Sequence, residues 1–295
     1  MEHGFHAKVI ADSINQDGIR ITSMECRYWR AIHSELMTHR AFARNAASSR
    51  AIPFYRFGHS VTGDSGPVPN CTYSMIDNDP FYPLFIGAEQ KGMQSGEELS
   101  DDKRLQALKI IADMKTYCLQ KCLDLYKLDV HKSIINRYLE PWSYITVIIT
   151  ATEWNNFFRL RVHPAAEKHF NLLASLVKEA MTISIPEELT VGEWHLPYIT
   201  DVERTAPIKY DIATLKKISA ARCARVSYLT HDGKRDPQSD LDLFAKLIER
   251  NDDVIHASPL EHVAQASSEY EQSGPFKGLK QFRKEYANEN VVGSI

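Results

Sequence analysis

The chain has 295 residues, of which 43% are hydrophobic and 25% are charged, and its formal net charge is −3. This composition is typical of a globular protein with one large domain or two small ones, not of a disordered or fibrous chain. A net charge so close to zero leaves no global basic field, which argues against nucleic acid as a partner, so any phosphate recognition must be local.

The sequence favours a cytoplasmic location. No apolar run approaches the roughly 20 residues that a membrane-spanning helix needs. The first six residues, MEHGFH, lack the basic and apolar regions of a signal peptide. The five cysteines include no C-x-x-C pair, which argues against a disulfide framework or a zinc ribbon. We therefore expect a cytoplasmic protein with no membrane partner.

The first half of the chain predicts a strand and two helices, with a long irregular stretch before the second helix. Residues 20–30 alternate as a strand does, and a helix is expected over 31–39. Residues 51–98 are rich in Pro, Gly, Ser and Asn and predict a long loop. Loops of this length within a compact domain usually have a function. An amphipathic helix is expected from Ser100 to about Leu128. Its apolar positions are Leu105, Leu108, Ile111, Met114, Leu119 and Leu123.

The second half alternates strand and helix signals. Residues 143–150 are rich in β-branched residues and predict a buried strand, and 153–181 predict a helix interrupted at its one proline. Residues 183–210 contain three prolines and little periodicity, and we expect a connection there. Two further helices are expected, at 216–227 and 239–250. The pattern indicates an α/β or α+β domain.

Residues 38–50, which we call the signature segment, are the most informative part of the chain. Thirteen positions hold three Arg, one His, one Asn and two Ser. Such a segment is poorly suited to a core and well suited to an anion, because Arg binds phosphate bidentately while Ser hydroxyls and backbone N–H groups add donors. The alternative for His39 and Arg40 is a basic helix end that interacts with the helix dipole.

Two later segments also place polar side chains where they need partners. Arg137 precedes Pro141 by four residues, just before the predicted buried strand. Asn156 and Arg161 lie five residues apart in N-N-F-F-R-L-R, an otherwise apolar and aromatic stretch. A bound ligand would supply partners for these groups, whose burial without hydrogen bonds is costly. The alternative is that Arg159 and Arg161 simply face solvent.

Together these segments resemble the flavin-dependent thymidylate synthases, in a divergent form. The signature segment matches the family pattern R-H-R-x7-S at three positions: His39, Arg40 and Ser48. Thr38 replaces the first Arg. Residues 137–141 match R-x3-P before a strand, and residues 156–161 match N-F-L-x-L-R on a helix. The resemblance implies an α/β (α+β) fold with a central sheet flanked by long helices.

The resemblance also implies roles for these residues. Arg161 would contact the pyrimidine, help to ionise its ring and act as the main catalytic residue. Arg137 would bind the nucleotide, and its phosphate would be held by Ser48, Ser49 and Arg50. The flavin would be contacted by His39, Arg40, Asn45 and Asn156.

The C-terminal third resembles further motifs of the same family in a changed order. Residues 220–228 are similar to the A-R-V-S-Y motif and residues 256–262 to H-x-[ST]-P-F-E-H, both of which precede the signature in the family. Residues 281–289 resemble a second, degenerate copy of the signature segment. The chain therefore looks permuted or partly duplicated. The implied organisation is a core at 1–182, a connection at 183–210 and a permuted or degenerate segment at 211–295 that packs on the core.

On this interpretation the C-terminal segment adds site residues. His256 would be catalytic and Ser258 would bind the cofactor, although the segment could instead only buttress the fold. The six-residue spacing of His256 and His262 fits no standard zinc motif, so we expect no metal.

Glu35 bears on the choice of base. The family usually has Gln at this position, three residues before the first Arg of the signature. Gln can donate and accept, which suits uracil, whereas an ionised carboxylate only accepts and suits the exocyclic amino group of cytosine. The sequence therefore leans to dCMP as substrate and 5-hydroxymethyl-dCMP as product, as in phage-type homologues of the family. The alternatives are methylation of dUMP to dTMP, with Glu35 paired to a nearby Arg, and a non-catalytic flavin- or nucleotide-binding protein.

The cofactors and partners follow from the resemblance. The family chemistry implies FAD, methylenetetrahydrofolate as the one-carbon donor, and NADPH as a candidate reductant. The signature segment contains no cysteine, so the sequence does not suggest a cysteine-nucleophile mechanism. Family members assemble as homotetramers with shared sites, which implies a homo-oligomer in the cytoplasm of a bacterium or a phage-infected host.

Overall fold

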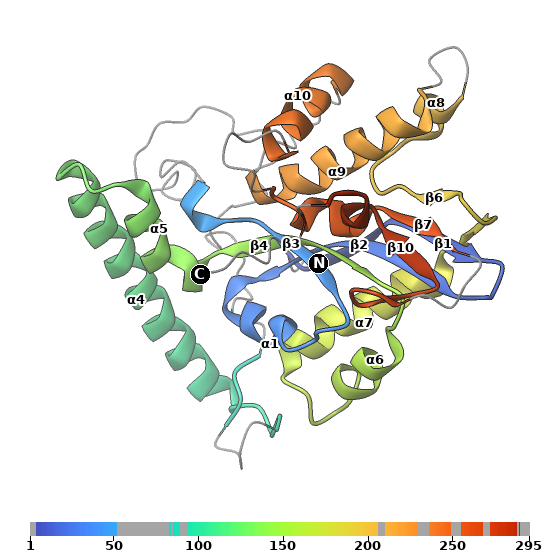
Figure 1. The fold of residues 1–295 in the computed structure, drawn as a ribbon. Helices are drawn as coiled ribbons and strands as arrows, with labels where there is room; N and C mark the ends of the chain where they lie inside the picture. Colours follow the sequence, from blue (N-terminus) through green and yellow to red (C-terminus); the bar gives the residue numbers. More distant parts are fainter. Residues whose placement is uncertain are drawn as a thin grey trace, which may run out of the picture.

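A five-stranded sheet lies at the centre of the structure, a computed structural model that describes residues 4–51, 83, 85–88, 94–205, 210–228, 236–248, 255–267, 272–287 and 289. Its strands stand in the order β3-β4-β2-β1-β5 (Figure 1). Their bounds, in that order, are Ala43–Ala46, Tyr144–Ala151, Arg20–Trp29, His6–Asn15 and Glu187–Leu189. Neighbouring strands are antiparallel except β1 and β5, which are parallel. The signature segment thus supplies an edge strand, β3, beside the buried strand β4.

The hairpin of β1 and β2 is closed by a turn that its own side chains define. The Asn15 Oδ1 atom accepts hydrogen bonds from the N–H groups of Asp17 (3.1 Å) and Ile19 (2.9 Å). Gly18 has a φ of +76°, a backbone conformation that residues other than glycine rarely adopt. This turn fixes the start of β2, where Arg20 lies.

The side chains of β2 and β4 alternate between the two faces of the sheet. β4 is rich in β-branched residues and is buried along its whole length. One face is apolar and belongs to the largest core cluster through Met24, Cys26, Tyr28, Val147 and Ile149. The opposite face carries more polar side chains, among them Ser23, Glu25 and Thr150.

Both faces of the sheet are covered. α7 (Lys168–Ile183) packs on the apolar face through buried residues such as Phe170, Leu173 and Val177. The other face is covered by α9 (Ile212–Tyr228), by the 3-10 helix η4 (Ser258–His262) and by a second sheet (Figure 1). The second sheet has the order β10-β7-β6, with bounds Leu279–Gln281, Ala264–Ala266 and Trp194–His195.

A chain of buried polar side chains joins the main sheet to this second layer. The His195 ring lies between two serines, with Nδ1 at 2.9 Å from Ser13 Oγ and Nε2 at 2.9 Å from Ser23 Oγ. Ser23 Oγ is 2.6 Å from Thr150 Oγ1, which is 2.8 Å from His262 Nδ1. Burial lowers the pKa of both histidines to about 3. The two rings are therefore neutral at ordinary pH.

The remaining elements lie around these layers. They are η1 (Arg30–Ile32), α1 (His33–Met37), η2 (Ser49–Ala51), α4 (Asp101–Lys127), α5 (Lys132–Leu139), η3 (Glu140–Trp142), α6 (Asn155–Arg161), α8 (Asp201–Arg204), α10 (Pro237–Ile248), β8 (Gln272–Ser273), β9 (Phe276–Lys277) and η5 (Phe282–Glu285).

Most of the elements expected from the sequence are confirmed. The structure is a mixed α/β fold with a central sheet and long helices, as the sequence indicates. The predicted strands at 20–30 and 143–150 are β2 and β4, and the predicted break in the 153–181 helix separates α6 from α7. The helices expected at 216–227 and 239–250 are α9 and α10.

The helix predicted over 31–39 is shorter than expected. It consists of η1 and the five-residue α1, and it ends at Met37. The Arg44 Nη1 atom donates to the last carbonyls of this segment, those of Leu36, Met37 and His39, at 3.1, 3.2 and 3.0 Å. Because these carbonyls gain a side-chain partner, the helix can stop there. His39 and Arg40 therefore lie after the helix.

Other differences come from short strands. The segment at 183–210 is more than a connection, because β5 joins the main sheet and β6 the second one. The sequence did not predict β1, whose apolar residues do not alternate cleanly. Most of the loop expected at 51–98 lies outside the described residues; within it, Gly87 pairs with Glu98 in an isolated bridge.

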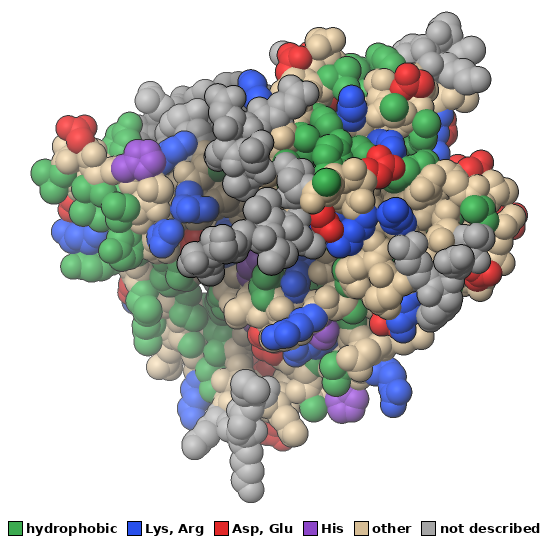
Figure 2. Space-filling view, viewed as in Figure 1, with side chains coloured by type: hydrophobic (Ala, Val, Ile, Leu, Met, Phe, Trp, Pro, Cys, Tyr) green, Lys and Arg blue, Asp and Glu red, His purple; other side chains and the backbone are tan. Residues whose placement is uncertain are grey.

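The long helix α4 is present, but its expected core face is largely exposed. Leu105 and Met114 are 66% and 55% exposed, and only Leu119 and Cys122 of this helix are buried. The reason is that α4 packs on α5, near its own C-terminal end, and projects from the rest of the chain (Figure 1). Figure 2 shows hydrophobic side chains along this side of the molecule. None of the helices in the described part of the chain combines the length and apolar character needed to cross a membrane.

Candidate functional site

A first cavity, of about 260 Å³, lies where the signature segment meets α5. It is lined by Arg30, Ser48, Ser49, Arg50, Arg137 and Glu140. Four of these residues were expected from the sequence to bind a nucleotide, and they come from two segments almost ninety positions apart. The structure therefore brings Ser48, Ser49 and Arg50 together with Arg137.

The turn at Ser48 and Ser49 is held by hydrogen bonds from three other segments. Asn136 Nδ2 donates to the Ser49 carbonyl (2.8 Å), and the Ser48 N–H donates to the Ser227 carbonyl (3.2 Å). The Ser49 hydroxyl donates to the Glu140 carboxylate. These contacts fix the turn that carries the two serines. Three guanidinium groups against one carboxylate leave the lining with a net positive charge, which suits an anion.

Arg30 is a cavity residue that was not expected from the sequence. It follows β2 directly, and its guanidinium donates to the Ala47 carbonyl (3.0 Å) and to Ser143 Oγ (3.2 Å). Arg30 therefore connects the end of β2 to the residue that follows β3. Its sequence neighbours, a run of strand residues, gave no local signal for this role.

A second cavity, of about 250 Å³, lies between the turn after α1 and helix α6. It is lined by Thr38, His39, Arg40, Ala41, Phe42, Glu153, Asn156, Phe157, Leu160 and Arg161. Four predicted site residues, His39, Arg40, Asn156 and Arg161, are thus brought together here. In this single chain they line a different cavity from Ser48, Ser49, Arg50 and Arg137.

Arg161 is the centre of the contacts in the second cavity. Its Nε–H donates to His39 Nε2 (3.0 Å), and its Nη2 atom lies 3.4 Å from Thr38 Oγ1. Its guanidinium stacks on the ring of Phe170, with 4.7 Å between the guanidinium carbon and the ring centroid. The group is thus oriented by three neighbours and still has N–H donors for a ligand.

His39 is neutral in this arrangement. Burial, together with the positive charges of Arg161 and Arg44, lowers its pKa to about 4. Because Nε2 accepts a hydrogen bond from Arg161, the single ring proton resides on Nδ1. The imidazole is therefore a fixed acceptor toward Arg161 and a donor on its other side.

Glu35 faces Arg161 across 3.5 Å, measured from its Oε2 to Arg161 Nη1. This distance exceeds that of a charge-assisted hydrogen bond, about 2.7–2.9 Å. Burial raises the pKa of Glu35, and the charge of Glu167 raises it further, while Arg161 opposes the shift. Glu35 lies beside the second cavity, although it is not among the residues that line it.

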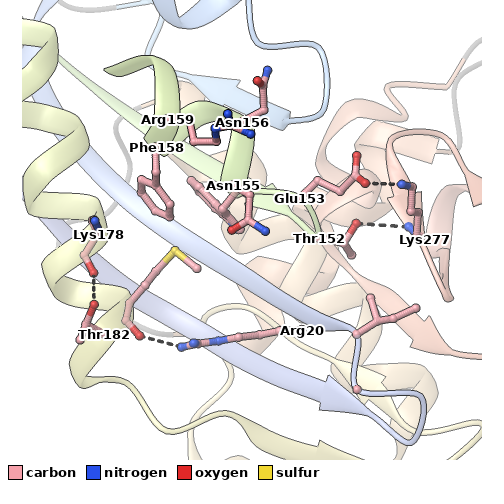
Figure 3. A pocket seen from close by; sticks show the side chains of 14 residues that line it. Arg20, Thr152, Glu153, Asn155, Asn156, Phe158, Arg159, Lys178, Thr182 and Lys277 are labelled. Carbon is pink, nitrogen blue, oxygen red and sulfur yellow. Dashed lines mark hydrogen bonds and ion pairs between the residues drawn. The ribbon is translucent and has the colours of Figure 1, made fainter. Parts of the chain in front are cut away.

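A third and larger cavity, of about 800 Å³, adjoins the second one and shares Glu153 and Asn156 with it (Figure 3). It is an open groove between the β1–β2 turn, the end of β4, helix α6 and the last turns of α7, and Lys277 of β9 closes one side. Among its lining residues, only Asn156 was expected from the sequence to be a site residue.

Besides Glu35, three predicted site residues line none of these three cavities in the described part of the chain. Asn45 is 6% exposed in β3, and its Nδ2 atom has no hydrogen-bond partner among the described residues. His256 is exposed, and its backbone N–H donates to the Leu247 carbonyl (2.9 Å). Ser258 is exposed at the start of η4. The single chain therefore does not bring these residues into contact with the cavity that holds Arg161.

The segments of the C-terminal third that resemble family motifs, residues 220–228 and 256–262, nevertheless lie beside β3. η4 and α9 both pack against β3, and Ser227 of α9 contacts Ser48 through the backbone. Arg222 is buried in ion pairs with Glu203 (2.6 Å) and Asp240 (2.8 Å). Arg222 therefore holds α8, α9 and α10 together rather than facing a cavity.

The chain was compared with protein families, curated proteins and solved structures. No protein-family profile matches the chain. No curated protein matches it either. Among solved structures, the chain is similar to PolB, a UMP/dUMP methylase from Streptomyces cacaoi, in its complexes with 5-Br UMP and 5-Br dUMP. Both comparisons give 13% sequence identity and cover 60% of this chain, with 88% and 94% of the PolB chain covered and TM-scores of 0.44 and 0.42.

Proposed function

We propose that this protein transfers a one-carbon unit to C5 of a pyrimidine nucleoside monophosphate in a flavin-dependent reaction. The observation that carries the proposal is the first cavity, where four residues expected to hold the nucleotide lie around one basic hollow. The substrate we favour is dCMP, converted to 5-hydroxymethyl-dCMP, and the alternative is methylation of dUMP to dTMP.

The first cavity suits the 5′-phosphate of the nucleotide. Arg50 and Arg137 are fork-shaped donors, and the Ser48 hydroxyl can complete the set. The Ser49 hydroxyl donates to Glu140, so Ser49 would have to exchange that partner for the phosphate. A hydrogen bond to a charged group contributes about 1.5–3 kcal/mol. Binding energy gained at the phosphate is remote from C5, so it can position the ring without touching the reacting atom.

Arg161 suits the ring. Attack from C5 requires electron density there, and negative charge then builds on the N3/O2 edge of the pyrimidine. A guanidinium already oriented by His39, Thr38 and Phe170 can stabilise that charge without rearranging. By analogy with oxyanion-hole donors, one such contact lowers the barrier by about 3–4 kcal/mol. Neutral His39 contributes by holding the Arg161 Nε–H in place.

The second cavity fits a flavin in its donor set. His39 Nδ1–H, Arg40 and the Asn156 amide offer donors and an acceptor to a heteroaromatic edge, and Phe42 and Phe157 offer apolar surface. When bound, FAD would supply the redox chemistry and methylenetetrahydrofolate the carbon, with NADPH as the reductant. Ser258 is exposed and would reach the flavin only if the site were completed by another copy of the chain, whereas Asn45 is buried in β3. We include a homo-oligomer, a tetramer by resemblance, in the proposal, and the exposed apolar face of α4 is consistent with it.

Glu35 supports the preference for cytosine, because a carboxylate beside the ring site can accept from an exocyclic amino group. Its closeness to Arg161 equally suits the alternative, in which Glu35 serves as an ion-pair partner. The two readings differ in their consequence. Only the first predicts that replacing the carboxylate by an amide changes the base that is modified.

The test is a mass spectrum of products. Purified protein with FAD, methylenetetrahydrofolate and NADPH receives equal amounts of dUMP and dCMP. We expect 5-hydroxymethyl-dCMP from the natural protein and a shift toward dTMP in Glu35→Gln. Thymidylate from the natural protein would replace dCMP by dUMP in the proposal. Tight flavin binding without any modified nucleotide would instead support a non-catalytic flavin- or nucleotide-binding protein.

A further inference from the structure

Arg44 is a half-buried cation to which the proposed function gives no role. It lies in β3, within the signature segment, and lines none of the three cavities. A charged group that leaves water needs partners, yet among the described residues Arg44 forms no ion pair. Its guanidinium instead contacts the backbone of a neighbouring segment. Those contacts indicate what this residue does.

Arg44 holds the turn that follows α1. Its Nη1 atom donates to the carbonyls of Leu36, Met37 and His39, at 3.1, 3.2 and 3.0 Å. α1 has only five residues, and its N-cap, Ile32, makes no side-chain hydrogen bond to it. A helix this short is not stable by itself. The position of the turn therefore depends on the packing of Leu36 in the core and on the Arg44 side chain.

The same segment supplies the polar partners of Arg161. Among the described residues, the Arg161 guanidinium contacts three polar side-chain atoms. They are His39 Nε2 (3.0 Å), Thr38 Oγ1 (3.4 Å) and Glu35 Oε2 (3.5 Å). All three belong to residues 35–39, the segment whose last carbonyls bind Arg44. A shift of this segment would therefore move every one of these polar contacts at once.

Both sides of the arrangement are anchored to the same strand. Arg44 is paired with Ile149 of β4 in the antiparallel ladder, and β4 is buried along its whole length. β4 also leads, through residues 152–154, into α6, which carries Arg161. The main sheet therefore positions Arg161 from one side and, through Arg44, the polar partners of Arg161 from the other.

We propose that Arg44 is a positioning residue for Arg161: it fixes the turn after α1 to β3, and that turn holds the Arg161 guanidinium in the orientation that stabilises charge on the pyrimidine. The inference rests on the proposed function, in which Arg161 has that task. Arg44 does not contact the first cavity, where the phosphate is expected to bind. Its loss should therefore lower the rate constant of product formation and leave the KM of the nucleotide almost unchanged.

The first test is kinetic, at saturating FAD and one-carbon donor. Arg44→Met should lower kcat about 10- to 100-fold, since a misplaced catalytic group has a cost of this order, and should change KM by no more than about 2-fold. Arg44→Lys keeps a cation with three N–H donors and should stay within about 5-fold of the natural protein. The matched control is Arg27→Met, which removes another half-buried arginine that donates to a backbone carbonyl, that of Gly4 (2.9 Å), and lines none of the three cavities. Its kcat should equal that of the natural protein.

A double variant shows whether Arg44 acts through Arg161. Arg44→Met combined with Arg161→Lys should be no slower than Arg161→Lys alone, because the second substitution has already removed the group that Arg44 positions. Rate losses that multiply would mean that Arg44 acts independently of Arg161, and they would overturn the proposal.

The ring of His39 provides a readout that needs no turnover. Because Nε2 accepts from Arg161, nitrogen NMR of histidine-labelled protein should show His39 as the Nδ1–H tautomer, with the signal identified by its loss in His39→Gln. In Arg44→Met the ring should populate both tautomers, and Arg44→Lys should restore the Nδ1–H form. If Arg44→Met does not fold, Arg44→Gln takes its place, because an amide can donate to at most two carbonyls.

This readout separates the inference from the proposed function. A His39 signal that is the same in the natural protein and in Arg44→Met would overturn the positioning role, even if modified nucleotide forms. A change of tautomer that Arg44→Lys reverses would uphold the role of Arg44 in orienting the pair of His39 and Arg161, even if the natural protein forms no modified nucleotide. In that case only the proposed function would fail.

Discussion

The buried histidines His195 and His262 should make the protein acid-labile, and His262→Gln should remove part of that lability. Burial lowers the pKa of each ring from 6.5 to about 3. The unfolded chain binds these protons more readily, so protonation favours unfolding. The stabilising contribution is complete above about pH 6.5 and is lost progressively as the pH falls toward 3.

The magnitude follows from these pKa values. At about pH 5 an unfolded histidine with a pKa of 6.5 is almost fully protonated, whereas a folded one with a pKa near 3 is almost fully neutral. The linkage relation then gives a loss of about 2 kcal/mol per buried histidine between about pH 7.5 and pH 5. His262→Gln keeps a partner for the Thr150 hydroxyl but cannot titrate, so its free energy of unfolding should fall by about 2 kcal/mol less over this range.

The assay is urea unfolding followed by tryptophan fluorescence at the two pH values, with free energies from linear extrapolation. His256→Gln is the matched control, because it makes the same substitution at an exposed position. Other histidines with lowered pKa values, such as His39, are common to all variants and cancel in the comparison. An equal loss of stability in His262→Gln and in the natural protein would refute the argument that His262 is neutral in the fold.

Three further predictions concern the cavities and the exposed helix. Arg137→Ala should weaken binding of the nucleoside monophosphate about 10-fold or more and leave binding of the nucleoside unchanged, as calorimetry with both ligands would reveal. Arg161→Lys should lower the rate constant of product formation about 10²- to 10³-fold, since an ammonium cannot replace the oriented fork; a change in KM alone would contradict a role in the transition state. The double substitution Leu105→Asp and Met114→Asp should yield a smaller species by light scattering if α4 forms a subunit contact, and an unchanged mass would exclude this face as the interface.

Much of the fold was accessible from the sequence because the relevant signals are local. The β-branched run of β4 and the helical periodicities of α4, α7, α9 and α10 depend only on neighbouring residues. The helix–helix boundary between α6 and α7 was marked by a proline for the same reason. The short strands β5 and β6 could not be found in this way, because each exists only through pairing with a distant strand.

The candidate site divides in a similar way. Residue type and spacing in the signature segment predicted an anion site, and the structure joins Ser48, Ser49 and Arg50 to Arg137 in one cavity. The sequence could not reveal that Arg222 would form buried ion pairs with Glu203 and Asp240. Nor could it reveal that Arg159 and Lys178 would line the same groove. The sequence by itself determined which chemical groups are available and which local elements carry them. Only the tertiary structure decided which of those groups meet. Strand pairing and core packing bring together segments that are far apart in the sequence, and the local sequence of either segment does not show which other segment it will contact.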